Sequence, residues 1–155
     1  MFLILALLLP TSVIPAAELA WPSNSASDLA IFVSTLRFRI YTDQCSAKVP
    51  ELKPRFESLM DGMNHRIQAI SSDLLASDLF KDMKDKPVPA QIIAAFMDSF
   101  DDVRHNLERL DAASVCPATL QNFGDMDDDA LKSGLTQSFT AVQNMIQKLN
   151  SPGAR

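Results

Sequence analysis

Histidine, cysteine and glycine are scarce in this chain, and each shortage argues against a class of protein. The 155 residues include two His, two Cys and four Gly. Two cysteines are too few for a cysteine-dense toxin scaffold, and with only two histidines they give no support to a Cys/His zinc site. Four glycines exclude a collagen-like repeat, which needs glycine at every third position. Sequence motifs for serine hydrolases, phosphate loops, dinucleotide folds and haem attachment (GxSxG, GxxxxGKS/T, GxGxxG, CxxCH) are absent.

Positive charge is also in short supply. Lys and Arg number 14 against 19 Asp and Glu, which gives a formal net charge of −5. We therefore expect no nucleic-acid partner, because phosphates require cations. Acidic residues are concentrated between Asp98 and Asp129, which indicates a solvated face or, alternatively, a docking surface for a basic partner. The apolar fraction of 47% is ordinary for a globular core, and the length predicts one helical domain over residues 18–150.

The first 17 residues have the order of a secretory signal peptide. An apolar run at residues 2–9 is followed by Pro10 and then by the small pair Ala16 and Ala17, and cleavage is expected after either alanine. The basic residues that usually precede such a run are missing. A transmembrane anchor is the alternative, but it needs about 20 apolar residues, and two prolines interrupt this segment. The sequence thus predicts export to the periplasm or the extracellular space, with no membrane span in the mature chain.

Two cysteines remain in the mature chain, Cys45 and Cys116. An even number in an exported protein favours one disulfide, with two buried free thiols as the alternative. The separation of 116 − 45 = 71 residues is far too long for a CxxC redox pair. We expect these two residues to be bonded to each other.

Apolar residues at helical spacing predict four helices. The first begins near Ser25 or Ser27, either of which can cap the free amides of its first turn. The second ends before the proline-containing segment at residues 85–89 and could continue through Leu79 and Phe80. The apolar stripes of the four helices, in chain order, contain Leu29, Val33, Leu36 and Ile40; Leu52, Phe56, Leu59, Met63, Ile67, Ile70 and Leu74; Ile93, Phe96, Phe100, Val103, Leu107 and Leu110; and Leu131, Leu135, Val142, Ile146 and Leu149.

The remaining boundaries follow from local signals. Residues 36–41 also alternate as a strand would, but no second strand is available to pair with them, so a helix is favoured. The third helix begins after Pro89 and is expected to stop at Pro117. A connector at residues 117–126 then leads to the fourth helix, whose start is marked by three consecutive Asp residues from Asp127 onward. Residues 151–155 are expected to form a flexible tail.

These elements predict an all-α fold, an antiparallel up-down four-helix bundle with one disulfide. In that topology the first and third helices run the same way, so their C-terminal ends lie together. Cys45 is expected at the end of the first helix and Cys116 at the end of the third. The predicted topology would therefore allow the disulfide, which needs Cα atoms within about 7 Å.

Candidate chemical sites are few. Residues 125–129 resemble the start of a calcium-binding loop, but Ala130 and Thr136 stand where glycine and a bidentate glutamate are needed, so helix capping is the better explanation. His65 and His105 each follow an aspartate by four residues, Asp61 and Asp101, and could be oriented by it for catalysis or metal binding. Both fall outside the apolar stripes, which favours exposed ion pairs. We predict no catalytic, metal or cofactor site.

Three functions remain compatible with the sequence, and the first of them is the one that we expect. The first is a non-catalytic protein-interaction module, such as an inhibitor, an immunity-like protein or a chaperone-like protein, whose partner is another exported protein. The second is a carrier that holds an apolar ligand between its helices, which requires a cavity of several hundred Å³. The third is an enzyme with an unrecognised site, which requires titratable groups that point inward.

Overall fold

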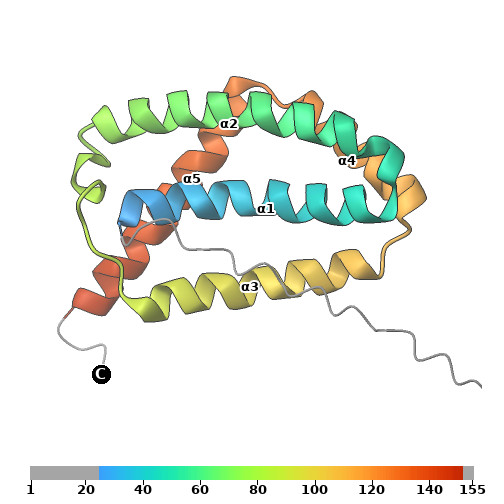
Figure 1. Cartoon of the computed structure of the whole chain (residues 1–155). Helices are drawn as coiled ribbons and strands as arrows, with labels where there is room; N and C mark the ends of the chain where they lie inside the picture. The colour runs from blue at the N-terminus through green and yellow to red at the C-terminus, as the bar shows by residue number, and fades with distance from the viewer. Residues whose placement is uncertain (1–24, 152–155) are drawn as a thin grey trace, which may run out of the picture.

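The computed structural model describes residues 25–151 (Figure 1). This part of the chain is helical without any strand, which confirms the predicted all-α class. An isolated backbone bridge joins Ser25 and Pro87. The predicted signal peptide (residues 1–17, with cleavage after Ala16 or Ala17) and residues 152–155 of the predicted tail lie outside the described residues. The elements are α1 (Ala26–Lys48), η1 (Pro50–Leu52), α2 (Lys53–Ala76), η2 (Lys81–Met83), α3 (Ala90–Glu108), α4 (Ala112–Gly124) and α5 (Asp128–Asn150).

The start of α1 and the end of α2 follow from their capping residues. The Oγ of Ser25 accepts a hydrogen bond from the amide of Asp28 at 3.2 Å, which confirms Ser25 as one of the two expected caps. The strand-like residues 36–41 lie inside α1, as the helical interpretation predicted. At the end of α2, Ser77 adopts an extended conformation and its hydroxyl donates to the carbonyl of Leu74. The helix therefore does not continue through Phe80.

The third predicted helix is wrong, because the chain forms two helices there. The helix α3 ends at Glu108, and α4 then begins at Ala112. The carboxylate of Asp111 accepts a hydrogen bond from the amide of Ala113 at 3.2 Å and so caps α4. Pro117 lies inside α4 rather than at the end of a helix. Most of the predicted connector at residues 117–126 is therefore helical, because α4 continues to Gly124. A proline removes one helical hydrogen bond and crowds the carbonyl four residues earlier, which here belongs to Ala113 in the capped first turn.

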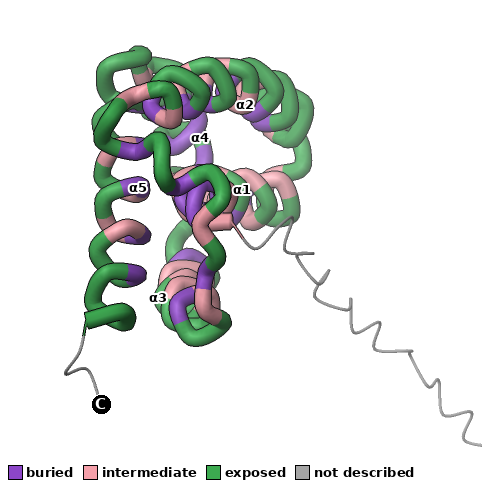
Figure 2. Tube along the Cα trace, turned by 90° about the vertical axis from the view of Figure 1, so that its left-hand side faces the viewer, coloured by how far each residue is buried: buried purple, intermediate pink, exposed green. Residues whose placement is uncertain are grey.

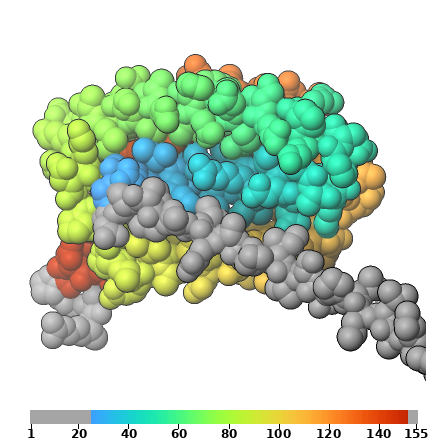
Figure 3. All heavy atoms as spheres, viewed as in Figure 1, coloured from blue at the N-terminus to red at the C-terminus, as the bar shows by residue number. Residues whose placement is uncertain are grey.

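Figure 1 shows how the helices lie around α1. The helix α2 passes above α1 and α3 passes below it, and Figure 3 shows the same order on the molecular surface. In Figure 1, α1 and α3 run in the same direction and α2 runs the opposite way. The helix α5 crosses obliquely behind α1 and lies to one side of it in Figure 2. Because α5 is inclined, it comes close to the start of α3 and diverges from α3 toward α4.

The core is formed by apolar side chains from all five helices and the η2 turn. Three phenylalanines, Phe56, Phe80 and Phe139, are completely or almost completely buried, and the rings of Phe80 and Phe139 meet edge to face at 5.3 Å. The predicted stripes are wrong at two positions: Leu110 is 45% exposed and Leu149 is 42% exposed. Leu110 lies in the break between α3 and α4, where the helical phase is lost. Leu149 lies in the last turn of α5.

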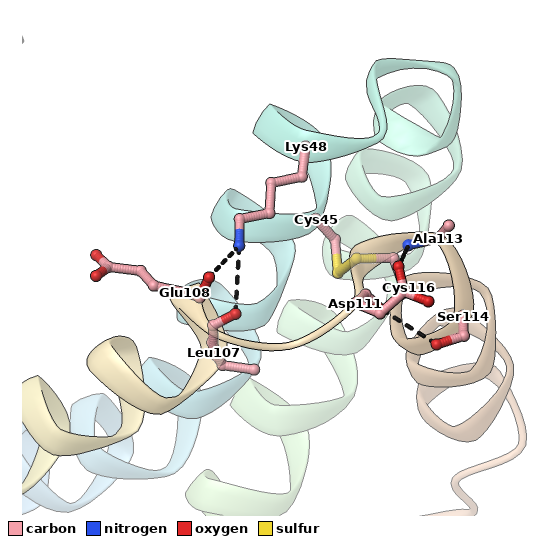
Figure 4. Close-up of a disulfide and its surroundings, with 8 residues drawn as sticks. All are labelled: Cys45, Lys48, Leu107, Glu108, Asp111, Ala113, Ser114 and Cys116. Carbon is pink, nitrogen blue, oxygen red and sulfur yellow. Dashed lines mark hydrogen bonds between the residues drawn. A yellow bond between two sulfur atoms is a disulfide. The ribbon is translucent and has the colours of Figure 1, made fainter.

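The C-terminal end of α1 is tied to both α3 and α4 (Figure 4). The sulfur atoms of Cys45 and Cys116 are 2.08 Å apart and their Cα atoms 5.4 Å apart, as in a disulfide. Cys116 lies in α4, so its expected place at the end of the third helix is wrong. The Nζ of Lys48 donates to the carbonyls of Leu107 and Glu108 at 3.4 and 2.8 Å. A cation at the end of α3 satisfies carbonyls that lack helical partners.

Candidate functional site

A groove of about 500 Å³ lies along α1 on the side that faces α4 and α5. Residues of all five helices line it, and it is partly open to solvent. We call it the α1–α5 groove. Its lining residues are Val33, Ser34, Arg37, Phe38 and Tyr41 of α1; Ile67 of α2; Phe100 of α3; Thr119, Asn122 and Phe123 of α4; Met126 of the following turn; and Ala130, Leu131, Gly134, Leu135 and Ser138 of α5.

Aromatic rings from α1 and α4 form one wall of the groove. The ring of Phe38 meets that of Phe123 edge to face at 4.8 Å, and the ring of Tyr41 meets Phe123 at 5.9 Å. Phe123 is itself buried. Such contacts fix the positions of the rings. The disulfide at Cys116, two turns earlier in α4, holds this helix against α1.

Small residues of α5 form the opposite wall. Ala130, Gly134 and Ser138 follow one another at intervals of four residues and therefore share one face of the helix. A Cβ atom placed on Gly134 would meet no atom within 4 Å. The groove is thus open directly above this glycine, while the larger Leu131 and Leu135 beside it are buried in the core.

Among the described residues that line the groove, Arg37 alone carries a charge. It is exposed, and its guanidinium carbon lies 6.0 Å from the centre of the Tyr41 ring. Within residues 25–151, no carboxylate lies within ion-pair distance of Arg37, whereas Arg66 and Arg104 pair with Asp128 and Asp101 at 2.6 and 3.6 Å. A cation therefore stands at an apolar groove without a counter-charge from the described part of the chain.

Arg66 of α2 helps to position the beginning of α5. Besides its pair with Asp128, Arg66 donates through Nη2 to the carbonyl of Met126 at 2.8 Å. Asp127 accepts a hydrogen bond from the amide of Ala130 at 2.8 Å, and it is the N-cap of α5. Of the carboxylates that resemble a calcium loop, Asp127 caps α5, as the capping interpretation predicted, whereas Asp128 pairs with Arg66. Over residues 25–151 there is no cluster of three side chains suited to a metal ion.

The two histidines do not form the ion pairs that the sequence suggested. His65 and His105 are both exposed, on different helices, as their positions outside the stripes predicted. The Nδ1 of each ring donates to the backbone carbonyl of the aspartate four residues earlier, at 2.9 and 2.8 Å. The bond is therefore made to the main chain and not to the carboxylate. Asp101 instead directs its carboxylate toward Arg104.

A second, shallower hollow of about 330 Å³ lies between α1 and α2. Charged and polar side chains line most of it, including Arg39, Asp43, Glu57 and Asp61. Desolvation raises the pKa of the Asp43 carboxyl, while the positive charges of Arg39 and Arg104 oppose this rise. Because Met60 is the one apolar side chain among the described residues that line it, this hollow is a poor site for an apolar ligand.

Sequence reasoning missed the α1–α5 groove, although it had singled out several of its residues. Val33, Phe100 and Leu131 were assigned to the apolar stripes and expected to fill the core. The available signal was the regular spacing of Ala130, Gly134 and Ser138, because small residues on one helical face leave space beside it. No family model matches the chain, and no curated protein or solved structure matches it either.

Proposed function

We propose that this chain is an exported, non-catalytic carrier that binds an apolar ligand in the α1–α5 groove. The observation that carries the proposal is the groove itself. Its volume of about 500 Å³ falls within the range of roughly 300–1,000 Å³ that is typical of small-molecule sites. Its walls are mainly aromatic and aliphatic, with a few polar groups, which is the usual composition of such sites.

Export is supported by two independent features. Residues 1–17 have the order of a cleavable signal peptide. The Cys45–Cys116 pair fits an oxidising compartment, the periplasm or the extracellular space. Between residues 25 and 151, none of the helices is both long enough and apolar enough to cross a membrane.

We also propose that α1, α2, α3 and α5 correspond to the four helices of an antiparallel up-down bundle. The helix directions in Figure 1 support this arrangement for α1, α2 and α3. The helix α4 is then an addition that carries Cys116 and one wall of the groove. The inclination of α5 distinguishes this bundle from a regular one, and it leaves room for a ligand.

A carrier is favoured over a protein-interaction module or an enzyme for structural reasons. A large exposed apolar patch would favour a docking face for another exported protein. Within residues 25–151 only four large apolar side chains are exposed, namely Leu79, Leu110, Met145 and Leu149. An enzyme would require inward-facing titratable groups. The buried polar side chains of residues 25–151 are Ser27, Thr35, Ser71 and Thr119, none of which ionises in the physiological range.

Filling the groove should strongly weaken the binding of an apolar ligand. In the variant Gly134→Leu the new side chain occupies open space above α5, so we expect the affinity for the neutral apolar dye Nile red to fall about tenfold or more. Fluorescence titration of the full, oxidised chain measures this effect. The matched control is Gly62→Leu on α2, another helical glycine whose Cβ would meet no atom within 4 Å but which does not line the groove.

Both variants replace a helical glycine with leucine and so gain the same helix propensity. A difference in their affinity for Nile red therefore reports on the groove. Wild-type affinity in Gly62→Leu and loss in Gly134→Leu would support the proposal. Equal binding by both variants, or a wild-type chain that does not bind the dye, would contradict it. Native mass spectrometry of the purified chain should also detect a co-purified apolar molecule in the wild type and none in Gly134→Leu.

A further inference from the structure

We infer that the ligand of the α1–α5 groove is a single-chain amphiphile with a carboxylate head, and that Arg37 binds this head at the mouth of the groove. The inference rests on the proposed function and adds to it the chemical class of the ligand. It is based on one juxtaposition: a lone guanidinium beside an apolar, aromatic-walled groove.

The charge of the groove selects an anion. Within residues 25–151, Arg37 is the only charged residue that lines the groove, and no carboxylate of that range pairs with its guanidinium. Guanidinium groups bind carboxylates through two parallel hydrogen bonds, which are stronger than neutral ones. The Tyr41 ring, 6.0 Å from the guanidinium carbon, helps to hold the cation in place.

The position of Arg37 determines where the head would lie. Val33, Arg37 and Tyr41 follow one another at intervals of four residues, so they share the face of α1 that lines the groove. Arg37 is exposed, whereas Phe123, Leu131 and Leu135, which also line the groove, are buried. An amphiphile bound here would keep its polar end at the solvent and its chain among apolar side chains.

The same features favour a ligand with one negative charge and one alkyl chain. A phosphate monoester carries close to two negative charges at neutral pH, and a single arginine leaves one of them uncompensated in a protein of net charge −5. A carboxylate carries one charge, which Arg37 alone neutralises. The volume of about 500 Å³ lies in the lower half of the range for ligand sites, which suits a single alkyl chain rather than a two-chain lipid.

Three dodecyl compounds that differ only in their heads test this inference. Dodecanoate, dodecanol and dodecyltrimethylammonium are used to displace Nile red from the full, oxidised chain. We expect dodecanoate to bind at least about tenfold more tightly than dodecanol, and the cation to bind most weakly, because only the carboxylate pairs with Arg37. The preference for dodecanoate should decrease as the salt concentration rises, since the pair is exposed.

Variants of two nearby arginines, Arg37 and Arg39, distinguish a specific pair between Arg37 and the carboxylate from general electrostatic attraction to the protein. Arg37→Gln should remove the preference for dodecanoate and leave the affinity for dodecanol unchanged. The matched control is Arg39→Gln, which removes the same charge two residues away at a position that lies outside the groove. It should retain the preference. Unfolding curves for both variants would exclude a difference in folding.

The possible results distinguish the inference from the function on which it rests. Equal binding of dodecanoate and dodecanol to the wild type, or a preference that survives in Arg37→Gln, would overturn the carboxylate inference and leave the carrier proposal standing. If none of the three compounds displaces the dye, or the dye itself does not bind, the carrier proposal fails and the inference fails with it.

Discussion

Replacing both Cys45 and Cys116 by serine should lower the free energy of unfolding by about 4 kcal/mol. The disulfide closes a loop with a sequence separation of 71 residues, and a cross-link of that length removes much of the conformational entropy of the unfolded chain. Chemical denaturation of the wild type and the double variant, both under oxidising conditions, measures the difference. The loss should be large because the bond joins the end of α1 to α4, and those helices share the groove wall.

A reducing agent provides the control for this experiment. It should destabilise the wild type by a similar amount and leave the double serine variant unchanged, because that variant has no bond to break. Equal stability of the wild type and the double variant in the absence of reductant would contradict the proposed cross-link. A reductant effect that persists in the double variant would show that the loss has another cause.

Truncating Phe139 should have a second large effect. Phe139 is completely buried on α5 and packs edge to face against Phe80. The variant Phe139→Ala leaves a cavity that the surrounding side chains can only partly fill, so we expect a loss of about 4 kcal/mol in the free energy of unfolding. Thermal or urea unfolding followed by circular dichroism measures it.

Leu149→Ala is the informative comparison, because it is on the same helix. The sequence pattern assigns Leu149 to the apolar stripe, whereas the structure leaves 42% of this residue exposed. We therefore expect a loss below about 1 kcal/mol. A loss at Leu149 as large as that at Phe139 would contradict the exposed position of Leu149 at the end of α5.

The regular helices could be predicted from the sequence because each carries its own signals. Ser25 marks the start of α1 and Asp127 marks the start of α5, and in both cases the side chain accepts a backbone hydrogen bond as expected. The stripe of α2 identified its buried face, from Phe56 to Leu74. These features depend on residues a few positions apart, so a one-dimensional pattern contains them.

The break between α3 and α4 could not be predicted in the same way. Leu107 and Leu110 continue the spacing of the third stripe, so the pattern gives no indication that the helix ends at Glu108. The proline at 117 is a stronger stop signal than Asp111, and it pointed to the wrong residue. The actual end of α3 is stabilised from a distance by Lys48, whose side chain binds the carbonyls of Leu107 and Glu108.

The groove depends on geometry that no local pattern contains. Its lining is brought together from all five helices by tertiary packing, which no single stretch of sequence contains. Val33 and Phe100 have the spacing of core residues, yet both line the groove. Arg37 had no distinguishing feature in the sequence. The role proposed for it depends on the apolar side chains that four other helices bring to the groove.

Photo-crosslinking tests the proposed site most directly. Dodecanoic acid that carries a diazirine in its alkyl chain is bound to the full, oxidised chain, and the complex is irradiated. The protein is then digested, and mass spectrometry of the peptides locates the labelled residues. We expect the labels on residues that line the α1–α5 groove, such as Phe38, Phe123 and Leu135, and their disappearance in Gly134→Leu. Labels on exposed apolar residues outside the groove, such as Leu79 or Leu149, in place of the groove residues would contradict the proposed site.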